Sequence, residues 1–243
     1  MGDGASIAAE TQLPVITDLR ALDLAFGGQG APIVPIGEKW LLGDFDFFLN
    51  LGGIANISFK SDPYIAFDIC AANRILNMLV NNEGKEYDDK GEMAKNGAIN
   101  FELLQKLNGL DYYSQPYPKS LANDFGTDIV YPMIFDTGCE TRDALRTYVE
   151  HIVIQTRDAI INLINNRPLR RSPSRQPANR KLLVTGGGAF NTFLVNRLSE
   201  ELKQLQIEVM VPDERLIQYK EAMIMAFMGV LRAGDRSITF FLR

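Results

Sequence analysis

Three short apolar segments follow one another early in the chain, and they limit its possible folds more than any other feature. They span residues 45–51, 54–59 and 64–68. Gly52-Gly53 separates the first two, and Ser61-Asp62-Pro63 separates the last two. Two β-type segments joined by Gly-Gly are typical of a hairpin, because such a turn needs positive φ at its centre. The sequence therefore predicts an antiparallel meander of three strands.

Helical periodicity replaces the β pattern after the third segment. Ile75, Leu76, Leu79 and Val80 form one apolar stripe, which predicts a helix over about 71–82. Helix and strand patterns then alternate, with helices expected at 143–165, 191–205 and 216–231 and strands at 181–185 and 207–211. Three antiparallel strands followed by βα units are the order of a ribonuclease-H-like lobe. We therefore predict an α/β fold of the actin-like ATPase type, with a mixed five-stranded sheet flanked by helices.

The composition is that of an ordinary globular protein and excludes several classes of function. The 243 residues are 46% hydrophobic and 23% charged, which excludes a disordered or disulfide-stapled chain. The net charge of −5 argues against nucleic-acid binding, which depends on clustered Lys and Arg. No apolar run approaches the roughly 18 residues that cross a bilayer. We expect a cytoplasmic protein that binds neither nucleic acid nor membrane.

Cysteine and histidine are too few to suggest metal or triad chemistry. Cys70 and Cys139 lie far apart without a CxxC spacing, which indicates reduced thiols. One His and two Cys cannot form a zinc site at the usual ligand spacing. His151 is the only histidine and falls within a helical pattern, which disfavours a role in a Ser-His-Asp triad. The sequence assigns no metal ligands.

Two glycine-rich turns have the composition of phosphate-contacting loops. Gly52-Gly53 lacks Cβ atoms and so exposes its N–H groups, with the Asn56 side chain as a further donor. Gly186-Gly187-Gly188 joins a strand to a helix that starts at Asn191, where free N–H groups favour negative charge. Taken alone, the first is more simply a tight hairpin and the second a packing turn. No Rossmann fingerprint or P-loop is present.

Asp68 is the carboxylate best placed for chemistry. The pattern puts it at the end of the third strand, and such positions line the cleft of an open α/β sheet, where a general base is often found. Capping of the next helix is an equally good interpretation. Glu221 lies early in the last predicted helix, where its simplest role is interaction with the helix dipole.

Together these motifs are more specific than any one of them. From Gly2 to about Arg232 the chain resembles the anhydro-N-acetylmuramic acid kinases of the actin and hexokinase superfamily. The Gly-Gly-Gln-Gly-Ala-Pro and Gly-Gly-Ile-Ala-Asn segments are highly specific for that family. The segments that carry the resemblance are Thr17-Asp18-Leu19-Arg20, residues 23–32, residues 49–58, Pro118-Lys119-Ser120, residues 186–191 and Glu221-Ala222.

The resemblance implies an ATP-dependent reaction in peptidoglycan recycling. Water opens the 1,6-anhydro bridge of anhydro-N-acetylmuramic acid, and the freed 6-oxygen takes the γ-phosphoryl of ATP, with Mg²⁺ on the phosphates. The product is N-acetylmuramic acid 6-phosphate, and Asp68 would be the general base that activates the water. The other implied roles are substrate binding for Asp18, Arg20, Asn73 and Glu221, phosphate contact for Gly52, Gly53 and Asn56, and adenosine contact for Gly186, Gly187, Gly188 and Asn191.

The chain departs from the family pattern directly after the base. The family has Asp-Thr-Gly-Pro-Gly-Asn, whereas this chain has Ile69-Cys70-Ala71-Ala72 between Asp68 and Asn73. Alanine in place of glycine costs little where φ is negative and more where φ is positive. The effect of this change therefore depends on the backbone conformation there.

A second departure concerns the front of the chain. The family begins with a phosphate hairpin ending in Asp-Gly-x-Asp, which has no match here. We expect residues 1–43 to be the closing part of a first actin-like lobe, and residues 44–243 to be a second lobe with a helical insertion at about 83–140. On this expectation the kinase is N-terminally truncated and crippled, and the alternative is a non-catalytic remnant or a nucleotide- or partner-binding module. Apolar surface exposed near residues 13–35 would either lower solubility or favour a homodimer.

Overall fold

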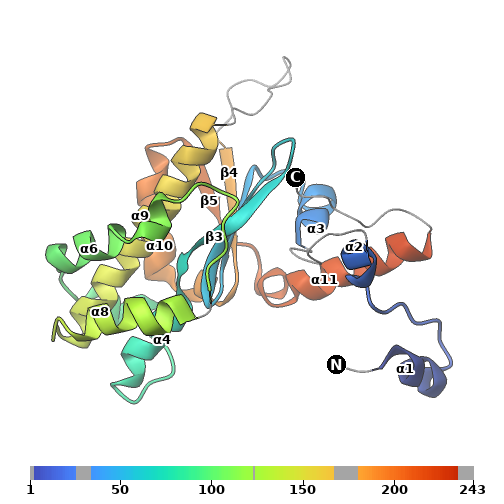
Figure 1. Ribbon diagram of the computed structural model, residues 1–243, viewed down its shortest axis with the longest axis horizontal. Helices are drawn as coiled ribbons and strands as arrows, with labels where there is room; N and C mark the ends of the chain where they lie inside the picture. Colours follow the sequence, from blue (N-terminus) through green and yellow to red (C-terminus); the bar gives the residue numbers. More distant parts are fainter. Residues whose placement is uncertain (1–2, 26–33, 123, 167–179, 235–243) are drawn as a thin grey trace. The chain divides into compact units, whose positions relative to one another are not determined.

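Five strands between residues 47 and 210 form one mixed sheet in the computed structural model, which describes residues 3–25, 34–122, 124–166 and 180–234 (Figure 1). β1 (Phe47–Leu51), β2 (Ile54–Phe59) and β3 (Ile65–Ala71) form the predicted antiparallel meander. β4 (Arg180–Thr185) and β5 (Ile207–Met210) continue the sheet in parallel from β1. The strand order is β3-β2-β1-β4-β5, which confirms the ribonuclease-H-like fold class.

The chain divides into two units, and the sheet belongs to the larger one, Asp44–Ile217. Its helical segments are α4 (Asn73–Asn81), η1 (Asp89–Gly91), α5 (Glu92–Lys95), α6 (Phe101–Asn108), α7 (Asp111–Ser114), η2 (Phe125–Val130), α8 (Tyr131–Phe135), α9 (Thr141–Asn166), η3 (Gly187–Phe190) and α10 (Thr192–Lys203). The smaller unit comprises Met1–Gly43 and Gln218–Arg243. Residues 27–32, which carry the Gly-Gly-Gln-Gly-Ala-Pro motif, lie outside the described residues.

One face of the sheet supplies the main core of the larger unit. Side chains alternate between the two faces of a strand, so Phe47, Leu49 and Leu51 of β1 share a face. All three are buried in one apolar cluster with α4, α9 and α10. The long helix α9 contributes an apolar stripe to this cluster, including Leu145 and Ile152, as its 3.6-residue periodicity predicts.

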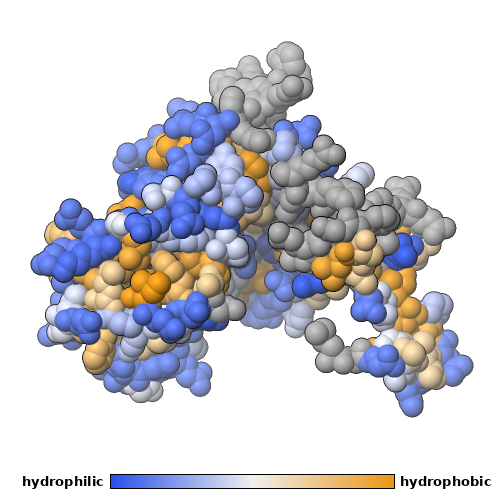
Figure 2. Space-filling model, in the orientation of Figure 1, coloured by the Kyte–Doolittle hydropathy of each residue, from blue (hydrophilic) through white to orange (hydrophobic). Residues whose placement is uncertain are grey.

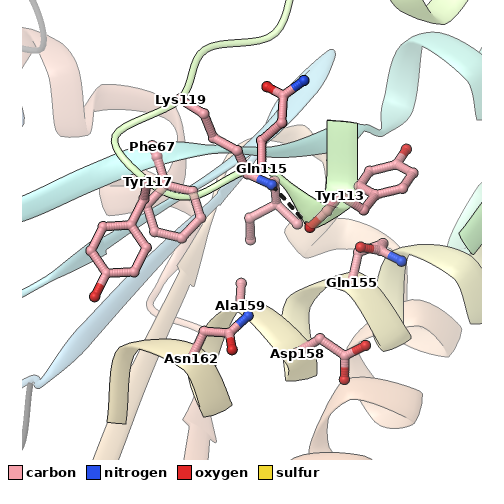
Figure 3. Close-up of a pocket in the computed structure, with 10 residues that line it drawn as sticks. Phe67, Tyr113, Gln115, Tyr117, Lys119, Gln155, Asp158, Ala159 and Asn162 are labelled. Carbon is pink, nitrogen blue, oxygen red and sulfur yellow. Dashed lines mark hydrogen bonds between the residues drawn. The ribbon is translucent and has the colours of Figure 1, made fainter. Parts of the chain in front are cut away.

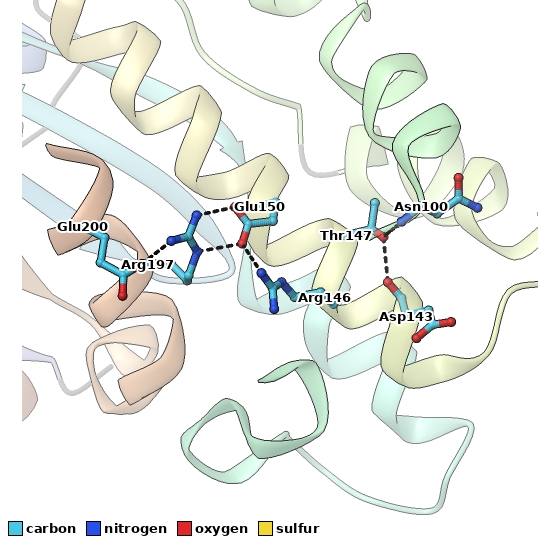
Figure 4. Close-up of polar contacts among 7 residues, drawn as sticks. All are labelled: Asn100, Asp143, Arg146, Thr147, Glu150, Arg197 and Glu200. Carbon is cyan, nitrogen blue, oxygen red and sulfur yellow. Dashed lines mark hydrogen bonds and ion pairs between the residues drawn. The ribbon is translucent and has the colours of Figure 1, made fainter. Parts of the chain in front are cut away.

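Polar contacts fix the position of α9 beside its neighbours (Figure 4). The Glu150 carboxylate accepts from the Arg197 guanidinium of α10 at 2.8 Å and forms an ion pair with Arg146 at 3.2 Å. The backbone N–H of Asn100 donates to the Thr147 hydroxyl oxygen at 2.9 Å, which ties the start of α6 to α9. The helices are therefore held to each other by charge as well as by packing.

The smaller unit contains α1 (Gly4–Thr11), α2 (Ala21–Ala25), α3 (Val34–Leu41) and most of α11 (Glu214–Ala233). Ile36 of α3 packs with Ile224 and Met228 of α11 in a small apolar cluster. The Lys220 ammonium lies 3.4 Å from the Glu38 carboxylate, and both side chains are buried. Within the described part of the chain, no helix is both long and apolar enough to cross a membrane.

The surface of the larger unit is mostly hydrophilic in the view of Figure 2. An apolar area is visible in the region of α6 and α8 (Figures 1 and 2). Phe101 of α6 and Phe135 of α8 are among the large apolar side chains that remain exposed.

Candidate functional site

The hairpin between β1 and β2 differs from the predicted turn. Leu51 lies opposite Ala55, so three residues rather than two separate the paired positions. Neither Gly52 nor Gly53 has a positive φ, in contrast to the expectation for a two-residue Gly-Gly turn. The longer connection removes the need for a left-handed residue. It also places Asn50 opposite Asn56.

Polar side chains follow one another across four strands of the sheet. Asn56 of β2 lies opposite Asn50 of β1 and Asp68 of β3, and Asn50 also pairs with Thr185 of β4. Directly opposed residues project from the same face of a sheet. Asp68, Asn56, Asn50 and Thr185 therefore form one polar row on the face opposite to the main core.

Asp68 lies within β3 and not at its end as predicted. The strand continues to Ala71 because it contains a bulge: Asp68 is opposite Asn56 and Cys70 is opposite Ala55, which leaves Ile69 without a partner. Helix α4 begins after Ala72, which makes no side-chain capping bond. The interpretation of Asp68 as the cap of that helix is therefore wrong.

The hairpin itself caps α4 with its carbonyl groups. The Gly53 oxygen accepts from the N–H of Ala72 at 2.8 Å, and the Gly52 oxygen accepts from the N–H of Asn73 at 3.1 Å. The Asn73 side-chain amide donates to the Leu51 carbonyl at 2.9 Å. The N–H groups at the start of α4 are thus bonded to the hairpin, and the Asn73 side chain links the helix to the end of β1.

The second glycine turn packs against the same end of β1. Gly186 has a φ of 82°, and a Cβ there would lie 2.6 Å from the Asn50 side-chain oxygen. A Cβ at Gly188 would lie 2.6 Å from the Leu51 Cβ. Gly187 has more room, since its nearest neighbour would be the Asn73 side-chain nitrogen at 3.5 Å. The structure therefore brings Gly52-Gly53, Gly186–Gly188 and Asn73 together at one edge of the sheet.

Both turns present backbone N–H groups that no other described residue uses. The N–H groups of Gly52, Gly53 and Gly187 make no hydrogen bond within the described part of the chain. The Asn191 side chain is already engaged, because its oxygen accepts from the N–H of Leu194 at 3.0 Å and caps α10. Unpaired N–H groups on adjacent turns are suitable donors for phosphate oxygens.

The Asp68 carboxylate is held by a segment that approaches the open edge of β3. Its Oδ2 atom accepts from the Ser120 hydroxyl at 3.0 Å and from the Leu121 N–H at 2.9 Å. The Asp68 N–H donates to the Lys119 carbonyl at 3.2 Å, and the Tyr112 hydroxyl donates to the Asp68 carbonyl at 2.7 Å. Burial, and secondarily the charge of Asp68, raises the pKa of Tyr112, so that its hydroxyl remains a donor.

The two alanines that replace family glycines lie outside the left-handed region, and Ala72, with a ψ of −106°, is neither helical nor extended. Neither Ala71 nor Ala72 has a positive φ, and Ala72 lies at −131°. Their side chains are buried, and a Cβ built on Gly126 would lie 3.1 Å from the Ala71 methyl group. The strain that alanine would cause at a left-handed position is therefore absent here.

Comparison with known proteins assigns the chain to a family. Residues 1–235 match the family described as anhydro-N-acetylmuramic acid kinase. The chain belongs to this family. The kinase of Aliivibrio fischeri is 36% identical over 210 residues, which is 83% of this chain and 54% of that protein. The kinase of Photobacterium profundum is 32% identical over 93% of this chain and 60% of that protein.

The chain therefore spans between about half and two thirds of the length of these relatives. Among solved structures, xylulose kinase from Rhodospirillum rubrum matches with a TM-score of 0.47 and 16% identity, over 95% of this chain and 46% of that chain.

The remaining residues predicted to contact the sugar lie in the smaller unit. Asp18 and Arg20 are exposed directly before α2, and Glu221 is exposed on α11 next to the buried Lys220. Asp18 has a φ of 53°, and its carbonyl accepts from the N–H of Ala21 at 2.9 Å. Their roles in substrate binding stay predictions.

A pocket lies between the segment that holds Asp68 and helix α9 (Figure 3). Its cavity volume is only about 40 Å³. Phe67 and Tyr117 stack in its wall with ring centroids 5.3 Å apart, and Asp158 and Asn162 of α9 lie across from them. Gln115 and Lys119 line it on the side of the aromatic rings, and Gln155 and Ala159 complete the side formed by α9.

Three residues at the candidate site were not predicted from the sequence. Asn50 and Ser120 lie within segments that resemble the family, so the resemblance marked their neighbourhood without assigning them a role. Thr185 ends β4, and its buried hydroxyl has no partner among the described residues. The pairing of Asn50 with Asn56 depends on the longer hairpin connection, and the contact of Ser120 depends on tertiary structure, so neither could be found from the sequence.

Proposed function

We propose that this chain acts as an ATP-dependent anhydro-N-acetylmuramic acid kinase of peptidoglycan recycling. Water adds to C1 of the sugar, the bond between C1 and the bridging oxygen breaks, and this 6-oxygen takes the γ-phosphoryl group of ATP. The products are N-acetylmuramic acid 6-phosphate and ADP. The proposal rests on the family assignment and on one observation: Asp68 shares a polar row with Asn56 and Asn50, and the Asn50 side chain lies against both glycine turns.

The two glycine turns are the proposed site for the nucleotide. We propose that Gly52 and Gly53 contact the phosphates through their unpaired N–H groups, with Asn56 as a side-chain donor. There is space at Gly187 beside Asn73. Gly186, Gly187 and Gly188 are therefore the proposed contacts of the adenosine part of ATP. The oxygen of Asn191 is engaged in capping α10, so its amide group is the part available to a nucleotide.

Asp68 is the proposed general base. Its carboxylate is only partly exposed, and one oxygen is already fixed by two donors. A base held in this way can accept the proton of the attacking water, and general base catalysis contributes roughly 10²–10⁴-fold to such reactions.

We propose that Mg²⁺ binds together with the nucleotide, through its phosphates, and not at a site formed by protein side chains alone. Residues 3–25, 34–122, 124–166 and 180–234 contain no cluster of three His, Cys, Asp or Glu side chains suited to a metal. Mg²⁺ usually keeps several waters and binds through substrate phosphates and one or two carboxylates. The cation would neutralise phosphate charge during transfer.

A direct assay tests the proposal. The purified chain and its Asp68→Asn variant are incubated with anhydro-N-acetylmuramic acid, ATP and Mg²⁺, and the sugar phosphate is detected by mass spectrometry. The asparagine variant keeps the shape of the side chain but cannot accept the proton, so we expect turnover to fall by roughly 10²-fold or more. Nucleotide binding, measured by calorimetry on the same samples, should change little.

The same experiment decides the alternative of a nucleotide-binding module without catalysis. Equal inactivity of both proteins with intact nucleotide binding would favour that alternative. The low kinase activity expected of this chain by itself stays a prediction, and the same assay tests it. The predicted homodimer and the cytoplasmic location also stay predictions.

A further inference from the structure

We propose that Ser120 is a positioning residue that fixes the orientation of the Asp68 carboxylate, so that Oδ1 is the atom that accepts the proton. This inference rests on the proposed function of Asp68 as a general base. It assigns a role to the Pro118-Lys119-Ser120 segment, which the family resemblance had marked without a function.

Both hydrogen bonds to the Asp68 carboxylate are accepted by the same oxygen, Oδ2. The Ser120 hydroxyl and the Leu121 N–H lie 3.0 Å and 2.9 Å from Oδ2. Among the residues that the structure describes, no donor reaches Oδ1. Two donors on one oxygen hold the carboxylate in one orientation. The other oxygen is then left oriented and free for a water molecule.

The segment that carries Ser120 is itself anchored. The Lys119 ammonium donates to the Tyr112 carbonyl at 2.9 Å. It also donates to the Tyr113 carbonyl at 3.4 Å (Figure 3). It also lies 4.4 Å from the centre of the Tyr112 ring. Burial lowers the pKa of Lys119. Lys119 therefore fastens the segment to α7 and does not point its charge at a phosphate.

The backbone of Asp68, in the edge strand β3, is also held by hydrogen bonds. The Asp68 N–H donates to the Lys119 carbonyl at 3.2 Å, so the segment runs beside β3 as an additional partner. The Tyr112 hydroxyl donates to the Asp68 carbonyl on the same side. Asp68 is thus held through its N–H, its carbonyl and one carboxylate oxygen. Among the described residues, the Ser120 hydroxyl is the only side-chain donor to the carboxylate, and it can be removed without altering the backbone.

Kinetics of Ser120 variants of the full chain test the role. Ser120→Ala should lower kcat roughly ten-fold and leave KM within about two-fold, because one donor that orients a charged group is lost. Ser120→Thr keeps the hydroxyl and should restore kcat to within about three-fold of the original value. Ser114→Ala is the matched control, since among the described residues the Ser114 hydroxyl donates only to the Asp111 carbonyl within α7. It should not change kcat.

A spectroscopic measurement tests the contact without turnover. The ¹³C resonance of the Asp68 Cγ atom, assigned by its loss in Asp68→Asn, should shift in Ser120→Ala and return in Ser120→Thr. An unmoved resonance, or an alanine variant with unchanged kcat, would overturn the proposal. A wild-type chain without kinase activity would contradict the proposed function instead, and the Cγ resonance alone would then decide whether Ser120 fixes Asp68.

Discussion

Gly188 and Leu51 touch where the second glycine turn meets the end of β1. A Cβ added to Gly188 would lie 2.6 Å from the Leu51 Cβ and 3.2 Å from the Leu51 carbonyl oxygen. Leu51 is fully buried and paired in the sheet, so it cannot move aside. This contact sets the distance between the two glycine turns.

Gly188→Ala should therefore destabilise the protein and separate the turns. Inserting a methyl group into a packed region costs about 1–3 kcal/mol. We expect the free energy of unfolding in urea to fall by that amount, and nucleotide affinity to fall with it.

Gly187→Ala is the matched control one residue earlier. Its Cβ would meet nothing closer than the Asn73 side-chain nitrogen at 3.5 Å, which is an ordinary contact. Stability should stay within about 0.5 kcal/mol of the original, as for other substitutions that strain nothing. Equal destabilisation by the two variants would show that the contact with Leu51 is not the cause.

Glu150 provides a second test of what holds the helices together. Its side chain is 7% exposed and joins Arg146 of the same helix to Arg197 of α10 (Figure 4). The hydrogen bonds to Glu150, more than those to Glu200, raise the pKa of Arg197. Glu150→Gln removes the charge between two arginines. We expect the free energy of unfolding to fall by about 2–4 kcal/mol, as when one partner of a largely buried ion pair is removed.

Glu200→Gln is the control for that variant. Glu200 also pairs with Arg197, but its side chain is 65% exposed, and exposed ion pairs contribute about 0–1 kcal/mol. Added salt should weaken the Glu200 contribution more than that of Glu150. If both variants lost the same stability, burial would not be what distinguishes the two pairs.

Much of the fold follows from periodicity in the sequence. The apolar alternation before residue 60 and the stripe on α9 predict β1, β2 and the longest helix to within two residues. These patterns are strong because each element buries one side against the same core. The strand order follows from the succession of a meander and βα units.

The exact geometry of the candidate site could not be predicted in this way. The hairpin register depends on the carbonyl groups of Gly52 and Gly53, which cap α4 twenty residues later. The bulge at Ile69 shifts the register of β3, so that pairing continues beyond Asp68 to Ala71. Ser120 reaches Asp68 across 52 positions of sequence, and no local pattern encodes such a contact.

His151, the single histidine, makes stability depend on pH. It is fully buried in α9, where its Nδ1 lies 2.7 Å from the Asn108 side-chain oxygen and its Nε2 lies 3.0 Å from the Tyr113 hydroxyl. The amide oxygen can only accept, so Nδ1 carries the proton and Nε2 accepts from Tyr113. Burial lowers the pKa of His151 to about 3. The native protein therefore contains the neutral ring.

The unfolded chain binds this proton more readily, because the pKa of an exposed histidine is about 6.5. The contribution of His151 is therefore fully present above pH 6.5 and is lost as the pH falls toward 3. Between pH 7 and pH 5 we expect the free energy of unfolding to drop by about 2 kcal/mol from this group. Urea titrations of the original chain and of His151→Gln, which cannot titrate, isolate the effect. Identical pH slopes for the two proteins would show that the buried ring is protonated as easily as an exposed one.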